Sequence, residues 1–207
     1  VSIRSCRMRL PRKGRVVLRV HPQARISRAP QVGETFFTDV PCELSPLIPA
    51  LPGKDTVFAV DIGTTTVAVL LADATTGEIL ARAGDFSAQI RYGDNVITRI
   101  GAASSPSTRL EMRRALVAET LAPLPEKACQ RAGRDLSRLA GGTIAGNTTM
   151  LHILADEDPS PLGIAPFTAR FLEGRILQSG DIGLPNGMPL HLLPGLSAYI
   201  GADITAG

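Results

Sequence analysis

The segment FAVDIGTTTVAVLLADATTGEIL, residues 58–80, places one carboxylate, one glycine and three hydroxyl groups between two apolar runs. Asp61 and Gly63 come first, and the hydroxyl groups that follow belong to Thr64, Thr65 and Thr66. In a tight turn between strands, several backbone N–H groups point outward, and a glycine lets an anion approach them without a Cβ in the way. The threonine hydroxyls could donate to phosphate oxygens, and Asp61 could hold a Mg²⁺ ion that bridges the phosphates. We therefore interpret this turn as a candidate phosphate site.

The alternative interpretation is a purely structural hairpin, in which Asp61 forms an Asx-type turn. The chain contains neither the P-loop pattern with its lysine nor the G-x-G-x-x-G pattern of dinucleotide sites. A phosphate site here would therefore be of another kind. We favour phosphate binding because the turn follows a strand that we expect to be buried and precedes two further strands.

A second candidate turn for contact with a nucleotide contains Gly146, Asn147 and Thr148. It follows a predicted strand at 138–147, and the ligands of α/β sheets tend to bind at strand ends. Asn147 could equally cap the short helix that we expect in the next segment, TTMLHILA. Both roles of Asn147 remain open at this point.

The elements around these turns predict an α/β fold with a mixed sheet flanked by helices. Apolar and β-branched runs separated by short turns predict an antiparallel meander of three strands, at Thr56–Val60, Val67–Ala72 and Ile79–Asp85. Helical spacing predicts helices at Asp94–Ala103, Thr108–Leu121 and Pro125–Ala132. We expect Ser107 to cap the second of these helices and Pro123 to stop it.

The last third of the chain is expected to contain more loop than regular structure. After the strand at 138–147 and the short helix, prolines predict a loop-rich region at 156–188. A final strand is expected at 189–195, and Tyr199–Ala206 is expected to begin a helix. His152 and His191 follow apolar spacing, so we expect both to pack in the interior rather than to bind a ligand.

The first part of the chain differs from the rest in charge and composition. Residues 1–28 hold eight Arg, one Lys and no acidic residue, whereas the other 13 basic and 19 acidic residues leave a net charge of −6. We predict a basic strand segment at 1–26, with its strand at 15–20, and an extended, proline-rich linker at 27–54. The body at 55–207 is the predicted folded lobe. A solvated strand face explains the arginines better than nucleic acid does, because no aromatic residues interleave with them to stack on bases.

Cysteine usage and hydropathy narrow the class of protein. Cys6, Cys42 and Cys129 are scattered and show no metal-ligand spacing, so neither a disulfide framework nor a zinc site is indicated. No apolar run approaches the roughly 20 residues that span a bilayer, and no signal peptide is visible, so we expect a cytoplasmic protein without membrane contact.

The turn and four later segments together resemble one family. The turn VDIGTTT with its meander resembles the first phosphate motif of the actin, hexokinase and chaperone ATPase superfamily (ASKHA). The later segments are QIRYGDNVITRI (89–100), GNTTMLHIL (146–154), GIAPF (163–167) and LPGLSAYIGADITAG (193–207). Between Phe58 and Gly207 the chain is similar to the ATPase domain of reductive activators of corrinoid proteins, the RACo type. The stretch at 5–22 is similar, more loosely, to the end of a ferredoxin domain.

The resemblance implies a function for a longer parent protein, of which this chain would be a fragment. Such a parent uses ATP, Mg²⁺ and a [2Fe–2S] cluster to return the Co(II) corrinoid of a methyltransferase corrinoid protein to Co(I), and could form a homodimer. It implies phosphate contacts from Gly63, Thr64, Thr65, Thr66, Gly146, Asn147 and Thr148, with Asp61 holding Mg²⁺. Asp203, in a Gly-x-Asp like that of sugar kinases, would orient the attacking water or else cap a helix. Cys6 matches the last cluster cysteine, but the other three are absent, so this chain alone could not hold the cluster.

Further expectations concern the missing parts and the competing functions. The second ATPase lobe is absent, so we expect 55–207 to be the first lobe, inactive by itself. Gln89, Tyr92 and Asp94 are expected to make domain contacts or to position water. A small-molecule kinase of the same superfamily, or a basic nucleic-acid-binding module, is the alternative function.

Overall fold

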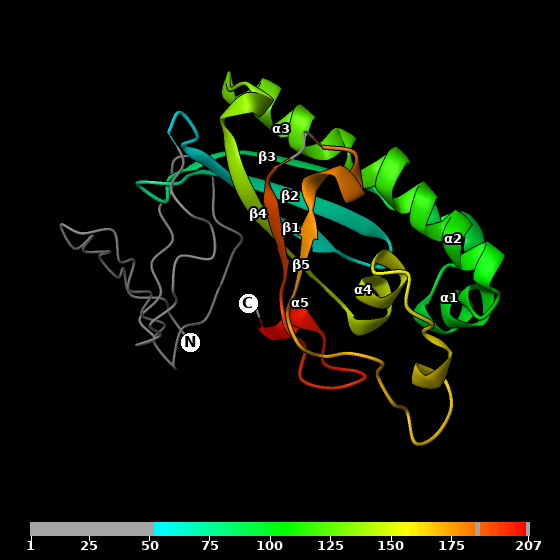
Figure 1. Ribbon diagram of the computed structural model, residues 1–207. Coiled ribbons are helices and arrows are strands. Elements are labelled where there is room, and N and C mark those ends of the chain that lie inside the picture. The colour runs from blue at the N-terminus through cyan, green and yellow to red at the C-terminus, as the bar shows by residue number, and fades with distance from the viewer. Residues whose placement is uncertain (1–51, 185–186, 206–207) are drawn as a thin grey trace, which may run out of the picture.

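The computed structural model describes residues 52–184 and 187–205. The predicted basic strand, Cys6 and all but the last residues of the predicted linker lie outside these ranges. The described chain forms a six-stranded mixed sheet in the order β3-β2-β1-β4-β6-β5, with helices packed against it (Figure 1). The predicted α/β fold with a mixed sheet is confirmed. No helix within 52–184 and 187–205 has the length and apolar composition needed to cross a bilayer.

Three antiparallel neighbours form one half of the sheet. They are β1 (Thr56–Ile62), β2 (Thr66–Asp73) and β3 (Ile79–Phe86), as the sequence predicted. In β1, alternate side chains including Phe58, Val60 and Ile62 are buried in the core. The register brings Ile62 opposite Val67, so the turn between β1 and β2 is tight.

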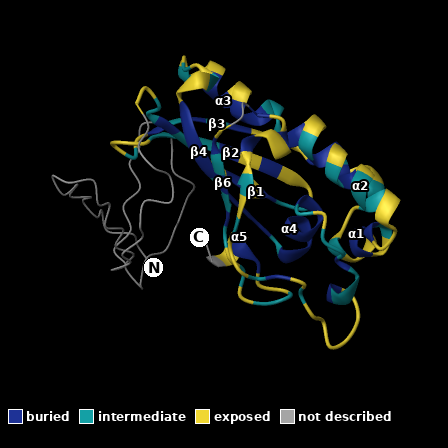
Figure 2. Cartoon of the chain, viewed as in Figure 1, coloured by how far each residue is buried: buried dark blue, intermediate teal, exposed yellow. Residues whose placement is uncertain are grey.

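Parallel pairing defines the other half of the sheet. β4 (Leu139–Gly146) pairs in parallel with β1, and Ile62 lies opposite Gly146 at the carboxyl end of both strands. β6 (Pro189–Leu192) continues the parallel pairing, and β5 (Arg175–Gln178) closes the edge antiparallel to it. Every residue of β4 except Thr143 is buried (Figure 2), because neighbouring strands and helices enclose it. Gly142 packs so closely on Phe58 that a Cβ there would lie 2.7 Å from the ring.

One long helical run crosses the sheet. It begins after α1 (Val96–Ala103) and consists of α2 (Pro106–Ala115), the π-helical η2 (Leu116–Leu121) and α3 (Pro123–Ala132), which packs on β2 and β3 (Figure 1). Two predictions about this run are wrong. Pro106 occupies the first helical position, so Ser105 rather than Ser107 is the N-cap residue. Pro123 does not stop the run but starts α3, because η2 has already changed the hydrogen-bond spacing: the Ala122 N–H donates to the Val117 carbonyl, five residues back.

The remaining elements are short. They are η1 (Ala88–Tyr92), η3 (Leu136–Arg138), α4 (Thr148–Leu154), η4 (Ser160–Leu162), η5 (Ser179–Ile182) and α5 (Ala202–Thr205). The expected strand at 189–195 ends at Leu192, and β5 lies in the region expected to be loop. The helix expected from Tyr199 begins only at Ala202, because residues 197–200 form a turn in which the Ile200 N–H donates to the Ser197 carbonyl.

An arginine lies in the interior and joins several of these elements. Arg99 of α1 is 0% exposed, and its Nε donates to the Gly93 carbonyl oxygen at 3.0 Å. Its Nη1 donates to Gln89 Oε1 at 3.3 Å and to Met150 Sδ at 3.2 Å, and burial lowers its pKa. Gln89 is also fully buried and donates from Nε2 to the Met112 carbonyl. Gln89 thus ties η1 to α1 and α2, which is a packing role rather than one at the surface.

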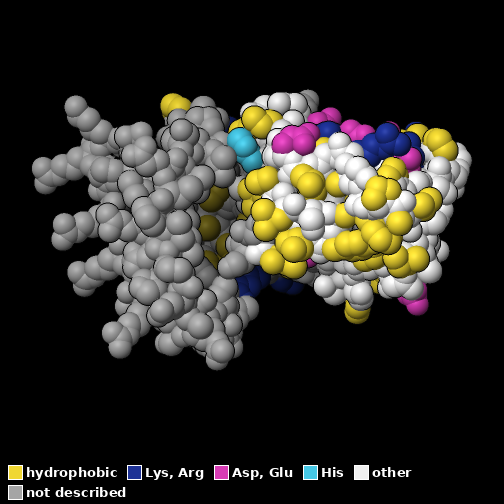
Figure 3. All heavy atoms as spheres, turned by 90° about the horizontal axis from the view of Figure 1, so that it is seen from below, with side chains coloured by type: hydrophobic (Ala, Val, Ile, Leu, Met, Phe, Trp, Pro, Cys, Tyr) yellow, Lys and Arg dark blue, Asp and Glu magenta, His cyan; other side chains and the backbone are white. Residues whose placement is uncertain are grey.

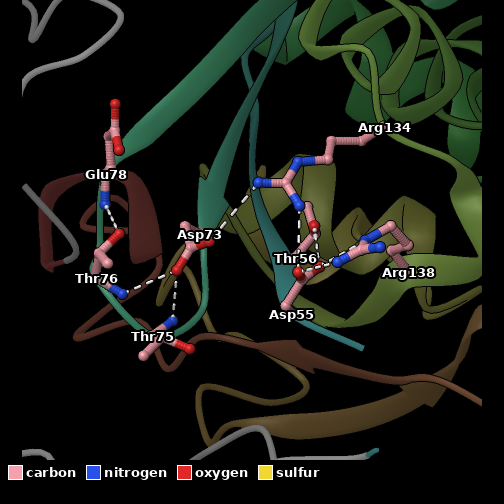
Figure 4. Close-up of polar contacts among 8 residues, drawn as sticks. All are labelled: Asp55, Thr56, Asp73, Thr75, Thr76, Glu78, Arg134 and Arg138. Atoms are coloured by element: carbon pink, nitrogen blue, oxygen red, sulfur yellow. Dashed lines mark hydrogen bonds and ion pairs between the residues drawn. The ribbon is translucent and has the colours of Figure 1, made fainter. Parts of the chain in front are cut away.

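A network of charged side chains around Asp55 lies at the end of β1 opposite to its turn with β2 (Figure 4). Asp55 Oδ2 accepts from Arg134 Nη1 at 3.1 Å and from Arg138 Nη2, and Oδ1 accepts from Arg138 Nε at 3.0 Å. The hydrogen bond from Arg138 is the main reason that the pKa of Asp55 lies far below its usual value. Arg134 also approaches Asp73 within 3.8 Å, so the network connects β1, β2 and the segment between α3 and β4.

This network predicts a pH dependence of stability. Because the folded-state pKa of Asp55 is depressed, its stabilising contribution is present above the usual pKa of about 3.9 and is lost as the pH falls below it. Asp55→Asn should therefore lower stability at pH 6 more than at pH 3, measured by denaturant unfolding at both pH values. Glu78→Gln is the control, since Glu78 points away from the network (Figure 4). Equal losses at both pH values for Asp55→Asn would contradict the prediction.

Candidate functional site

The turn between β1 and β2 is a compact loop at the carboxyl end of β1. The Gly63 N–H donates to the Thr66 carbonyl at 3.0 Å and closes the turn. A Cβ at residue 63 would lie 2.6 Å from that carbonyl oxygen, so the position requires glycine. Thr65 and Thr66 are exposed, and Thr64 is half-buried. The predicted hydroxyl groups are therefore present at the surface of one tight turn.

The second predicted turn lies beside the first. Asn147 Oδ1 accepts from the Met150 N–H at 3.0 Å, so the prediction that Asn147 caps α4 is confirmed. Asn147 Nδ2 donates to Thr64 Oγ1 at 3.1 Å, which joins the two turns directly. Gly146 lies opposite Ile62, and a Cβ on it would come within 2.9 Å of the Ile62 carbonyl oxygen. The Thr148 hydroxyl donates to the Ser197 carbonyl at 2.9 Å.

The third predicted segment packs on the second. A Cβ at Gly201 would lie 2.6 Å from Asn147 Cα and 2.6 Å from the Gly146 carbonyl oxygen, so only glycine allows this approach. Asp203 follows in the first turn of α5 and is exposed. Its negative charge contributes to the raised pKa of Asp61 of β1, as expected for two carboxylates that lie near each other. Three segments far apart in the sequence thus meet at the carboxyl ends of β1 and β4.

The electrostatics of this edge favour a cation. Asp61 is accessible, but protein atoms around its carboxyl remove part of its hydration, and this desolvation together with the charge of Asp203 raises its pKa. A bound divalent cation would offset both effects, because it stabilises the ionised form of Asp61. Within the described residues, no group of three or more His, Cys, Asp or Glu side chains could hold a metal ion. A cation here would therefore need ligands from a phosphate group or from water, as Mg²⁺ commonly does.

Several other residues singled out in the sequence lie away from this edge. His152 is fully buried, with Nδ1 2.7 Å from the Thr148 carbonyl and Nε2 accepting from the Arg170 N–H at 3.0 Å. The ring also stacks on Phe171, so the expectation that His152 packs in the interior is confirmed. His191 lies in β6, and its Nε2 is buried without a partner among the described residues. Tyr92 packs against the core, and Asp94 accepts from Asn95 Nδ2 on the surface.

Two features of the site were missed in the sequence. The bond between Asn147 and Thr64 joins residues 83 positions apart, and no local pattern announces it. The close approach of Gly201 had a signal, because a glycine directly before a helix start often marks a place where two backbones touch.

This chain is similar to a known family and to known proteins. The family model described as RACo middle region matches residues 56–207. The corrinoid activation enzyme RamQ of Eubacterium limosum is 33% identical over 151 residues, which are 72% of this chain and 26% of that protein. A solved structure of a reductive activator for corrinoid, iron-sulfur protein matches with a TM-score of 0.70 and 29% identity, over 76% of this chain and 25% of that one. The chain spans about a quarter of the length of these relatives.

The close packing of α5 on the second turn gives one prediction. Gly201→Ala should destabilise the chain by about 1–3 kcal/mol, because the added Cβ meets backbone atoms that cannot move independently. Chemical denaturation would measure the loss. Gly101→Ala is the matched control: no atom lies within 4 Å of its Cβ position, and alanine in the helix α1 should be neutral or stabilising. If both variants have the stability of the unmodified chain, α5 does not depend on this contact.

The electrostatic interaction between Asp61 and Asp203 gives a second prediction for this site. Asp203→Asn removes a negative charge near Asp61, so the pKa of Asp61 should fall toward its ordinary value in the absence of metal. A carboxyl ¹³C NMR titration of Asp61 would measure the shift. Asp181→Asn, which alters an acid of η5 that bonds to Gln178, should leave the Asp61 titration unchanged. An unchanged Asp61 pKa in Asp203→Asn would show that the two carboxylates do not interact.

Proposed function

We propose that this chain, which belongs to the RACo family, forms the first lobe of the ATPase domain in a cytoplasmic reductive activator of corrinoid proteins. The parent protein would couple ATP hydrolysis to one-electron reduction of Co(II) to Co(I) in the corrinoid protein of a methyltransferase system. The names of both relatives, a corrinoid activation enzyme and a reductive activator, support this assignment of substrate class.

The observation that carries the proposal is the meeting of three segments at one sheet edge. The glycine turn after β1, the Asn147 turn after β4 and the start of α5 are joined by the bond from Asn147 to Thr64 and by the packing of Gly201 on Asn147. Ligands of α/β folds bind beyond the carboxyl ends of the strands, and this edge is such a place. A hairpin that served only to reverse the chain would not need these further contacts.

The side chains at this edge have separable roles in the proposal. Asp61 would supply a carboxylate oxygen for Mg²⁺, which would neutralise phosphate charge. Gly63 lets the turn close, since its N–H donates to the Thr66 carbonyl and a Cβ would not fit there. Thr64, Thr65 and Thr66 on this turn donate hydrogen bonds to phosphate oxygens. Gly146, Asn147 and Thr148 form the neighbouring turn, which the Asn147 amide joins to Thr64. Asp203, exposed and close enough to act on Asp61, accepts a hydrogen bond from the attacking water and orients it.

In the proposal, electron transfer is the task of another part of the parent protein. Cys6 would be the fourth cysteine ligand of a [2Fe–2S] cluster in the parent, and that cluster would supply one-electron redox chemistry. The lobe described here contributes the ATP step, which makes transfer to a low-potential acceptor favourable. Because a nucleotide in such ATPases is held between two lobes, this lobe alone should bind ATP weakly, on the order of millimolar Kd.

The test is the effect of Asp61→Ala on the parent protein. Loss of the carboxylate should lower the ATPase rate on the order of 100-fold at saturating Mg²⁺, with a smaller loss of nucleotide affinity. Corrinoid reduction, followed by the absorbance of the Co(I) state, should fall in the same proportion. Glu78→Ala, at the hairpin turn on the opposite end of β2, is the matched acidic control and should retain both activities. An ATPase rate unchanged by Asp61→Ala would refute the metal-binding role.

A further inference from the structure

We propose that Asn147 is a positioning residue that fixes the Thr64 hydroxyl as a hydrogen-bond donor to a phosphate group of the bound nucleotide. This inference rests on the proposed function and adds a residue that sets the direction of one phosphate contact. It comes from the two contacts of a single side-chain amide, one to α4 and one to the turn between β1 and β2.

The orientation of the amide follows from its first contact. Asn147 Oδ1 accepts from the Met150 N–H at 3.0 Å, and an N–H group can only be satisfied there by the oxygen. The nitrogen Nδ2 must then face the other way, toward Thr64 Oγ1 at 3.1 Å. The helix cap therefore determines that the amide nitrogen, and not the oxygen, faces Thr64 in the turn.

The orientation of the amide in turn determines what Thr64 can do. A hydroxyl group has one proton and two acceptor positions, and Nδ2 occupies one acceptor position of Thr64 Oγ1. The proton of the hydroxyl remains, and among the described residues the structure shows no acceptor for it. Thr64 is only half-buried, so this proton can reach a ligand at the turn. Phosphate oxygens are strong acceptors and would take it.

Capping alone does not explain the second contact. Serine, threonine and aspartate cap helices about as well as asparagine, because the N–H groups of the first turn need only one oxygen. Asn95 shows the simpler case: it caps α1 through the Thr98 N–H at 3.0 Å, while its Nδ2 contacts only the exposed Asp94. Asn147 differs because its nitrogen reaches the turn between β1 and β2, and because Gly201 packs on its Cα.

These differences define the variants. Asn147→Ser keeps a capping oxygen but is too short to reach Thr64. Asn147→Asp also keeps the cap, but its carboxylate would accept the Thr64 proton and repel phosphate. Thr64→Val removes the hydroxyl with little change in shape. Asn95→Ser is the matched control, since it makes the same change at the cap of α1.

The experiment is a titration of the parent protein with Mg·ATP, read by calorimetry. Asn147→Ser and Thr64→Val should each raise Kd about tenfold, the effect of one hydrogen bond to a charged group. The double variant should bind like Thr64→Val alone, because Asn147 acts through Thr64. Asn147→Asp should bind more weakly than Asn147→Ser, and Asn95→Ser should bind like the unmodified protein.

Unchanged affinity in Asn147→Ser, or losses that add fully in the double variant, would overturn the inference while leaving the proposed function intact. If the unmodified parent shows no Mg·ATP binding, the proposed function fails, and the inference fails with it. Hydrogen exchange of the ligand-free protein guards against a folding defect. Asn147→Ser should speed exchange at the Gly63 amide, which closes the turn by donating to the Thr66 carbonyl, while α4 stays protected. Fraying of α4 with an unaffected turn would mean that Asn147 is only a cap.

Discussion

Parallel pairing of β1 with β4 is the constraint on which the rest of the structure depends. In a parallel pair both carboxyl ends lie at one edge, so the turn after Ile62 and the turn after Gly146 must be neighbours. Glycines at two positions of β4 let β1 pack closely on it, because a Cβ on Gly142 would meet the Phe58 ring and a Cβ on Gly146 would meet Ile62. The Asn147 bridge and the packing of Gly201 both follow from this pairing. The relative positions of the two turns are therefore determined by strand pairing in the sheet rather than by the conformations of the loops alone.

Buried polar side chains also help to fix the relative positions of the elements. Arg99 has no carboxylate partner in the described part of the chain; instead, a carbonyl, an amide oxygen and a sulfur accept from it. Nη2 of Arg99 is buried without a partner among the described residues, so the loss of a contact to Nε or Nη1 would leave still more of this buried charge unsatisfied. The acceptors come from η1, from the segment after it and from α4, so Arg99 fixes the relative positions of those elements. The segment that resembled a family motif at 89–100 is thus structural in the described residues.

The sequence allowed prediction of the elements whose pattern is local and strong. The meander and β4 have continuous apolar runs, and Asn147 has the chemistry of a cap, so their positions could be inferred. β5 could not, because four residues with alternating exposure at a sheet edge look like loop until β6 pairs with them. The run through Pro123 could not either, since a proline usually ends a helix unless the preceding turn has widened. Among the site residues, types and strand ends were predictable, whereas the contact between Asn147 and Thr64 depends on the tertiary fold.

The pKa values of the two aspartates at the ends of β1 are shifted in opposite directions. Asp55, just before the strand, is held ionised by arginines, whereas Asp61 near its end is pushed toward the neutral form. At the usual rise per residue of a strand, they lie roughly 20 Å apart. A falling pH therefore protonates the two ends in sequence, Asp61 first and Asp55 last. Acidification would therefore neutralise Asp61 at the carboxyl end of β1 while Asp55 at the opposite end still holds its ion pairs, so the charge at one edge of the sheet changes while the network at the other edge persists.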